Sequence, residues 1–252
     1  MNTEEQFKKR ITELGRMSFA RDIVMFSDFL DLNQQNIVRS IPWKQYGIQL
    51  SFDGGYEMAE RKMAAFIPAS LADLYPVIYP FQCLEISPVS AKYAEKLNHR
   101  DFMGSILALG VDRSRIGDII VKDERAYFFC QENLLDFFTE ELRMIRHTAV
   151  NVQLVDAAFT RVEPEMKEVT GSVASVRLDS IIALAFGTSR SSISSLIPRG
   201  NVQVNAKVIT SAGYQVNAGD VISVRGFGKC RFAQVLNTTK KGREVVRLYK
   251  YV

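Results

Sequence analysis

The sequence predicts an α+β protein with a helical amino-terminal region, a central α/β domain and a basic carboxy-terminal module. Apolar residues recur at helical spacing over the first 46 positions, and short apolar strands alternate with two helical segments between positions 81 and 155. From Val173 onward, 12 Lys and Arg face 3 Asp and Glu, a net charge of +9, whereas the preceding residues hold 20 against 25, a net charge of −5. This asymmetry indicates a basic module carried on a near-neutral body.

Residues 1–75 are predicted to form the mostly helical region. The apolar positions at helical spacing are Phe7, Ile11, Leu14, Ile23, Phe26 and Leu30. Gly15 and the polar stretch 33–36 supply breaks between helices. Two apolar runs, 46–52 and 63–67, are candidate strands on either side of Asp53-Gly54-Gly55. Because no Lys-Ser or Lys-Thr pair follows these glycines, they indicate a turn and not a phosphate-binding loop.

Residues 76–157 are predicted to form the central domain. Its expected elements are strand 81–86, helix 99–109, strands 118–121 and 125–130, helix 132–145 and strand 149–155. This β-α-β-β-α-β order occurs in many small domains, including RNA-recognition ones, but the order alone does not establish RNA binding. Tyr127 and Phe129 lie on the third strand, where such a sheet displays aromatic side chains to bases. Either they stack on RNA, or one face of this strand belongs to the core.

The carboxy-terminal module, residues 173–252, follows a polar stretch, 158–172, that has no clear period and is typical of a linker. The first apolar face of the module consists of Leu178, Ile181, Ile182 and Ala185. It predicts a short helix that Gly187 ends. Ser189 is placed to cap a second helix with Arg190 in its first turn. Unpaired amides at a helix start, beside an arginine fork, predict a site for phosphate.

The module resembles the RNA-binding domain named after protein S-four of the small ribosomal subunit. The matching positions are Arg177-Leu178-Asp179, Ser189-Arg190-Ser191, Leu196-Ile197, Gly200, Val202, Val204-Asn205, Lys207 and Gly219-Asp220. The resemblance implies two helices that form a wedge against a small sheet, with the second helix docking on folded RNA. Ser192 and Ala206 depart from the family, in which lysine and glycine are common at these positions. The first change weakens phosphate contact, and the second makes a tight turn less comfortable.

The candidate RNA-binding residues form two sets. The resemblance implies Arg177, Ser189, Arg190 and Lys207. Further basic candidates in the module are Arg199, Arg225, Lys229, Lys240, Lys241 and Arg243. The last three lie around the turn of a predicted hairpin, whose strands are 230–236 and 243–251. On its second strand one face carries Arg243, Arg247, Tyr249 and Tyr251. This face either holds phosphates and bases or is an ordinary solvated surface.

Motifs along nearly the whole chain are similar to those of the bacterial YlmH family. They are Gly55-Tyr56, Ala59-Glu60-Arg61-Lys62, His99-Arg100-Asp101-Phe102-Met103-Gly104, Ile116-Gly117-Asp118-Ile119 and Val224-Arg225-Gly226-Phe227-Gly228-Lys229. The resemblance implies association with the large ribosomal subunit, through its ribosomal RNA and through transfer RNA that carries a nascent chain. It also implies a part in the rescue or quality control of stalled ribosomes, and older descriptions connect the family with cell division.

Several other classes of protein are disfavoured. The acidic first residues are unlike a secretion signal, and no apolar run approaches the roughly 18 residues of a membrane span, so a cytoplasmic protein without membrane contact is expected. Cys83, Cys130 and Cys230 are too scattered for a disulfide framework or a zinc site and are expected to be buried thiols. His99 and His147 stand apart from other metal-ligand types. Neither a metal nor a cofactor is therefore expected.

Two alternatives to a non-catalytic RNA-binding protein stay open. An RNA-modifying enzyme with an S-four-like targeting domain would need a cofactor loop or a nucleophile beside a base, and the sequence shows neither. His99-Arg100-Asp101 is similar to part of a kinase catalytic loop, but Ile106 replaces the asparagine of that pattern, which favours a structural role. An interaction scaffold linked to cell division would show weak RNA binding with little dependence on salt.

Overall fold

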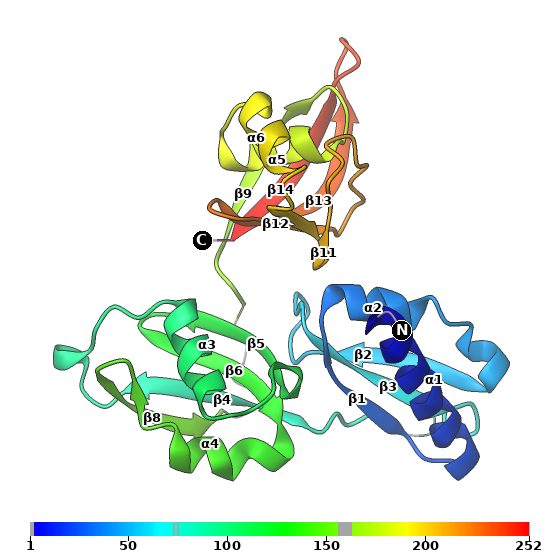
Figure 1. The fold of residues 1–252 in the computed structure, drawn as a ribbon, viewed down its shortest axis with the longest axis vertical. Helices are drawn as coiled ribbons and strands as arrows, with labels where there is room; N and C mark the ends of the chain where they lie inside the picture. Colours follow the sequence, from blue (N-terminus) through cyan, green and yellow to red (C-terminus); the bar gives the residue numbers. More distant parts are fainter. Residues whose placement is uncertain (1–2, 73, 75, 156–162, 252) are drawn as a thin grey trace. The chain divides into compact units, whose positions relative to one another are not determined.

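The computed structural model describes residues 3–72, 74, 76–155 and 163–251, and it divides the chain into two compact units, Met1–Glu163 and Pro164–Val252 (Figure 1). Both units combine helices with antiparallel sheets, which confirms the predicted α+β class. Among the described residues, no helix offers the apolar length that a membrane crossing needs.

Unit 1 begins with a three-stranded sheet that carries one long helix. Its elements are α1 (Thr3–Arg21), β1 (Met25–Leu30), α2 (Leu32–Arg39), a 3-10 helix (Trp43–Tyr46), β2 (Ile48–Asp53) and β3 (Lys62–Pro68), with the sheet order β1-β3-β2. Ile11 of α1 shares a buried cluster with Trp43 and Phe66. The indole N–H of Trp43 donates to the carbonyl of Val38 at 2.7 Å, so the ring is hydrogen-bonded as well as buried.

The prediction of a mostly helical amino-terminal region is correct for α1 and α2 but wrong between them. Residues 25–30 form the strand β1, in which Met25 pairs with Phe66 and Leu30 with Lys62 of β3. The Ser27 hydroxyl accepts the amide of Ala64 at 2.9 Å where the register shifts. Pairing with β3 therefore overrides the helical spacing of the apolar residues in this stretch.

Neither of the expected breaks ends a helix. Gly15 lies inside α1, where a Cβ would come within 2.2 Å of the Trp43 ring. The stretch 33–36 lies inside α2, whose start is fixed by a capping box at Asp31. The two expected strands are confirmed as β2 and β3. Gly55 between them has a φ of 89°, which explains why this turn uses glycine.

The second part of unit 1 confirms the β-α-β-β-α-β order. Its elements are β4 (Phe81–Pro88), a 3-10 helix (Ala91–Tyr93), α3 (His99–Ala108), a 3-10 helix (Arg113–Arg115), β5 (Ile116–Lys122), β6 (Arg125–Gln131), a 3-10 helix (Glu132–Leu134), α4 (Leu135–Glu141), β7 (Met144–Ile145) and β8 (Thr148–Leu154). The sheet order is β5-β6-β4-β8-β7, and α3 and α4 pack on one face around Phe102, Phe128 and Phe138. The second helix ends at Glu141 and not at residue 145, because β7 pairs with β8.

The other face of this sheet is covered by the amino-terminal sheet of the same unit. Phe129 is 3% exposed, and its ring stacks on Tyr56 with the centroids 5.8 Å apart. Phe29 of β1 belongs to the same buried cluster. The hypothesis that Phe129 displays its ring to RNA is therefore wrong, and the alternative of a core position holds. Tyr127 is half-buried against this cluster.

A polar network completes the contact between the two sheets. The carboxylate of Asp118 accepts from the Tyr56 hydroxyl at 2.8 Å, from the Glu60 amide at 2.7 Å and from the Arg61 amide at 3.2 Å. The Arg61 guanidinium donates to the carbonyl of Phe29 at 2.7 Å. Burial raises the pKa of Asp118, and the three donors oppose that shift.

Unit 2 is a six-stranded sheet with two helices on one face. Its elements are β9 (Met166–Val173), α5 (Leu178–Phe186), α6 (Arg190–Leu196), β10 (Val202–Val204), β11 (Lys207–Val208), β12 (Val221–Val224), β13 (Gly228–Thr238) and β14 (Glu244–Tyr251). The sheet order is β11-β10-β12-β13-β14-β9. Ile182 of α5 and Ile193 of α6 are buried in one cluster with Phe232, Val246 and Leu248 of the sheet, as the predicted wedge requires.

One part of the expected linker is wrong. Residues 166–172 belong to β9, which pairs with β14 from Met166 opposite Tyr251 to Val173 opposite Glu244. Half of the β9 residues, Lys167, Glu168, Thr170 and Ser172, are polar and exposed, and the strand lacks a regular alternation of apolar and polar residues by which sequence analysis finds strands. Residues 158–162 of the stretch lie outside the described residues.

Candidate nucleic-acid interface

The helix pair α5–α6 is built as the sequence predicts. Gly187 ends α5 in the left-handed conformation, with a φ of 63°. The Ser189 hydroxyl then accepts the amide of Ser192 at 3.2 Å and caps α6. Arg190 is the first residue of α6. The Ser192 amide of this helix start is therefore already hydrogen-bonded within the protein.

Asp179 joins the two arginines that flank the helix pair. Its side chain is 4% exposed, and its Oδ2 accepts from Nε and Nη2 of Arg190 at 3.2 and 2.6 Å. Nε of Arg177 lies 3.5 Å from its Oδ1. The side chains of Arg177 and Arg190 remain 40% and 53% exposed. A buried carboxylate thus hydrogen-bonds one guanidinium group and lies within ion-pair distance of a second, and both side chains remain partly exposed, an arrangement suited to phosphate oxygens.

Lys207 follows the tight turn between β10 and β11. It is exposed on β11, opposite Val204, and follows Asn205 and Ala206, which have φ values of 49° and 63°. The Asn205 amide group donates to Asp220 at 2.8 Å and accepts the Val221 amide at 3.0 Å. These hydrogen bonds stabilise the turn even though Ala206 adopts a positive φ, which is less favourable for alanine than for glycine, as the sequence predicts.

Arg199 and Arg225 come from two adjoining loops. Arg199 follows α6 and Arg225 follows β12, and both are exposed. The amide of Arg225 donates to the carbonyl of Asn201 at 2.9 Å, which ties the two loops together. The sheet and helix pair therefore gather basic side chains from segments that are separate in the sequence.

The candidates around the β13–β14 turn form a separate group. Lys240 and Lys241 are exposed in this turn. Arg243 donates from Nη2 to the carbonyl of Ser172 at 2.6 Å and from Nε to its hydroxyl at 3.2 Å, so it fastens β14 to β9. Since β13 rises about 3.3 Å per residue, the turn lies on the order of 30 Å from Lys229 at the start of the strand. RNA that used both groups would have to span that length.

The outer face of β14 carries the residues that alternation predicts. Val246 and Leu248 are buried against the helices, which places Arg247, Tyr249 and Tyr251 on the opposite face. Nε of Arg247 lies 3.2 Å from Glu168, and Nζ of Lys229 lies 5.4 Å from the centroid of the Tyr251 ring. Because Arg247 is paired with a carboxylate within the protein, this contact favours an ordinary solvated surface over a phosphate-binding one.

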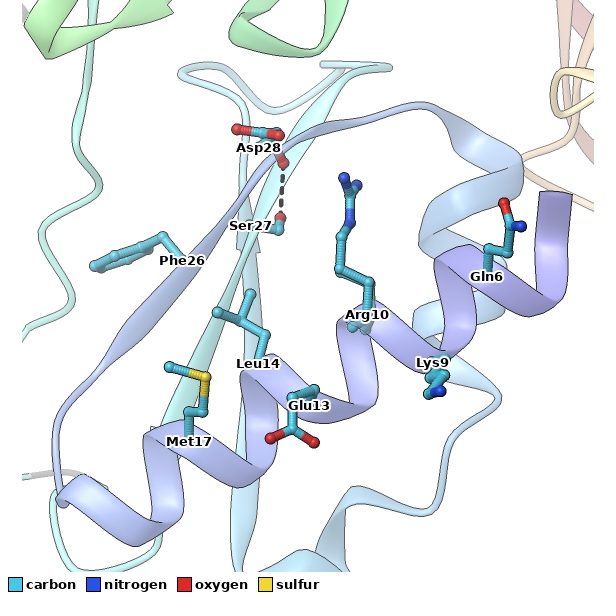
Figure 2. A pocket seen from close by; sticks show the side chains of 10 residues that line it. Gln6, Lys9, Arg10, Glu13, Leu14, Met17, Phe26, Ser27 and Asp28 are labelled. Atoms are coloured by element: carbon cyan, nitrogen blue, oxygen red, sulfur yellow. Dashed lines mark hydrogen bonds between the residues drawn. The ribbon is translucent and has the colours of Figure 1, made fainter.

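A hollow between α1 and β1 bears on the enzyme hypothesis (Figure 2). It has a volume of about 670 Å³, and its lining includes apolar Leu14, Met17 and Phe26 with charged side chains around them. The Ser27 hydroxyl in this lining donates to the carbonyl of Asp28 at 2.7 Å. The Ser27 hydroxyl is thus engaged with backbone groups on both sides, since it also accepts the Ala64 amide, and neither bond is to a side chain that would activate it as a nucleophile.

The remaining reactive residue types have structural roles. Cys83, Cys130 and Cys230 are buried, and burial raises the pKa of each thiol to about 12, so all three are neutral at physiological pH. Asp101 accepts the amide of Asn98 in the capping box of α3, which confirms a structural role for that segment. Among the described residues, no group of three or more His, Cys, Asp and Glu is placed to hold a metal ion.

Sequence reasoning missed part of this surface. It did not connect Asp179 with Arg190, because the eleven-residue separation hides a contact that the helix hairpin creates. It quoted Phe227 only within the motif Val224-Arg225-Gly226-Phe227-Gly228-Lys229 and gave it no role of its own, and it did not mention Lys250.

Comparisons with known proteins identify two matching domains in the chain. The family model described as "Putative RNA-binding domain in YlmH" matches residues 79–159, and the "S4 domain" model matches residues 176–222. The ribosome-associated protein quality control protein P2 of Bacillus subtilis (strain 168) is 30% identical over 244 residues, which cover 94% of this chain and 89% of that protein. The small ribosomal subunit protein uS4A of Clostridium novyi (strain NT) is 42% identical over 65 residues, 24% of this chain and 32% of that protein. The solved structure of cell division protein ylmH from Streptococcus pneumoniae is 21% identical and covers 64% of this chain and 96% of its own, with a TM-score of 0.51, which indicates a shared fold.

Proposed function

Because this chain belongs to the YlmH family, we propose that it is a non-catalytic, cytoplasmic RNA-binding protein that associates with the ribosome in the quality control of stalled translation. Its partners in this proposal are ribosomal RNA of the large subunit and transfer RNA that carries a nascent chain. The Bacillus subtilis relative is named for ribosome association and quality control, and the S4 match lies in the basic unit.

The observation that carries the proposal is the pair of half-exposed arginines fixed by buried Asp179. Flexible surface arginines lose side-chain entropy when they bind, whereas Arg177 and Arg190 are already oriented. Arg199, Lys207 and the rest of unit 2 add positive charge around them. Oriented forks on a positive surface favour the phosphates of a folded RNA over a neutral partner.

The proposal is tested by cosedimentation with separated ribosomal subunits at two salt concentrations. Binding through phosphates releases counterions, so it should weaken steeply as salt rises and should favour the large subunit. Crosslinking of the bound protein then maps the RNA sites. Equal binding to both subunits, or binding that ignores salt, would contradict the proposal and favour the interaction scaffold.

The contributing residues are tested by a double variant. Arg190→Ala combined with Lys207→Ala would reduce affinity, but Arg190 also neutralises buried Asp179, so Arg199→Ala with Lys207→Ala is the cleaner pair. We expect RNA binding to weaken by about 1–3 kcal/mol and the salt slope to fall by about 1–2. Lys8→Ala with Lys9→Ala removes the same charge from α1 in unit 1 and should leave the slope nearly unchanged. Turnover of a modified nucleoside in these samples would instead revive the enzyme hypothesis.

A further inference from the structure

The turn between β12 and β13 exposes one aromatic ring of unit 2. Phe227 keeps 40% of its surface in solvent. Gly226 and Gly228 on either side have φ values of 86° and 112°, which other residues adopt only with strain. The two glycines therefore hold the ring at the tip of the turn. A single exposed apolar residue is ordinary on a protein surface, so the neighbours of Phe227 decide what it can do.

The ring of Phe227 is supported by a second aromatic residue. Phe186, at the end of α5, lies with its ring centroid 5.8 Å from that of Phe227, at an interplanar angle of 58°. Nζ of Lys250 lies 5.3 Å from the centroid of the Phe186 ring. This support fixes the position of Phe227 and brings an ammonium group to the base of the turn.

The surroundings of the turn are positively charged. Arg225 is exposed two residues before Phe227, and Lys229 follows it by two residues. No Asp or Glu occurs between Asp220 and Glu244. An exposed ring within a region of positive charge complements a base that is flanked by phosphates. An apolar pocket of a protein partner would match the ring but not the charges.

The turn also adjoins the proposed interface. The hydrogen bond from the Arg225 amide to the Asn201 carbonyl, at 2.9 Å, joins it to the loop after α6 that carries Arg199. This bond places the turn that carries Phe227 beside the loop that carries Arg199.

We propose that Phe227 is a stacking site for one unpaired nucleobase of the RNA that unit 2 binds, with Arg225 and Lys250 beside the flanking phosphates. This inference rests on the proposed function, because it requires RNA at unit 2. A base inside a paired helix has both faces covered, so the ligand class is RNA with a bulged or looped nucleotide. Stacking accepts any base, which predicts recognition of the unpaired state and not of a sequence.

The test uses the full chain and two synthetic RNA hairpins, one with a single bulged 2-aminopurine and one fully paired. Wild-type protein should quench the fluorescence of the bulged 2-aminopurine, because stacking on an aromatic ring quenches it. Phe227→Leu keeps an apolar contact with Phe186 but removes the ring, so quenching should be lost and affinity for the bulged hairpin should fall about 5-fold or more. Affinity for the paired hairpin should not change.

Two further variants guard the interpretation. Phe227→Trp keeps a ring and should retain quenching, and Phe19→Leu changes another exposed phenylalanine, 57% exposed in unit 1, and should behave as wild type. If wild-type protein sediments with ribosomes but quenches neither hairpin, or if Phe227→Leu quenches as well as wild type, the stacking site is wrong and the proposed function stands. If wild-type protein ignores ribosomes at low salt, both proposals fail. If the wild-type protein does not quench 2-aminopurine fluorescence but Phe227→Leu loses ribosome binding, the ring contacts a protein partner instead.

Discussion

Replacement of Asp179 by asparagine tests whether a buried carboxylate organises the arginines of unit 2. Its side chain is 4% exposed and receives two hydrogen bonds from Arg190, at 3.2 and 2.6 Å. Hydrogen bonds to charged groups contribute about 1.5–3 kcal/mol. The Arg190 side chain is 53% exposed, so solvent screening brings the expected value toward the lower end. For Asp179→Asn, we expect a loss of about 1–2 kcal/mol in the free energy of unfolding of unit 2.

Hydrogen exchange on peptides from α5 and α6 measures this loss where it occurs. Trp43, the one tryptophan in the sequence, lies in unit 1, so its fluorescence should report no change. The control is Glu168→Gln, which removes a carboxylate that is 50% exposed and paired with Arg247, and which should cost less than about 1 kcal/mol. Equal effects of the two substitutions would refute the role of burial at Asp179.

RNA binding by the same two variants separates orientation from charge. Each substitution raises the net charge of unit 2 by one, so charge alone predicts slightly tighter binding for both. If Asp179 orients Arg177 and Arg190, Asp179→Asn should bind more weakly than wild type while Glu168→Gln does not. Tighter binding by Asp179→Asn at low salt would refute the orienting role.

Three other predictions follow from the structure. Asp118→Ala removes the acceptor of three hydrogen bonds between the two sheets of unit 1 and should destabilise that unit by about 2–4 kcal/mol, measured by urea unfolding followed through tryptophan fluorescence. Ala206→Gly relieves a φ of 63° and should stabilise unit 2 by about 0.5–1 kcal/mol in thermal unfolding. The thiols of Cys83, Cys130 and Cys230 have pKa values raised to about 12 by burial, so the folded protein should resist thiol reagents at pH 8. Because these thiols ionise near pH 9 when unfolded, they should lower stability as pH rises from about 9 toward 12.

The sequence predicts elements well where local chemistry decides them. Ser189 caps α6 and Gly187 ends α5, because a hydroxyl acceptor and a residue without Cβ suit those positions. The central β-α-β-β-α-β order can also be predicted, because its strands are largely apolar and α3 begins with a capping box at Asn98. Prediction succeeds here since each signal lies within a few residues of the feature it specifies.

The errors arise where distant residues decide the outcome. Residues 25–30 have apolar spacing that suits a helix, and only pairing with β3 makes them a strand. Gly15 stays inside α1 because Trp43 needs the space of a side chain there. Phe129 occupies the position of a stacking aromatic, but Tyr56 covers it. None of these partners can be read from the local sequence.

The candidate site likewise has features that the local sequence predicts and features that depend on distant residues. The basic residues of the module are visible in the sequence, yet the contact between Asp179 and Arg190 exists only because α5 and α6 fold back on each other. The separation between the β13–β14 turn and the rest of the site follows from the length of β13. Composition shows which residues carry charge, whereas topology decides which of them act together.

The cover over Phe129 has a practical meaning for anyone who divides this chain into fragments. A piece that began near residue 76 would open to water a face containing Phe81, Cys83 and Phe129, and such a surface would adhere to itself. The face of the central sheet that binds ligands in other domains of this architecture is here buried against the amino-terminal sheet. These positions should therefore accept only side chains of similar size and shape. The two sheets of unit 1 should be expressed together and should unfold together.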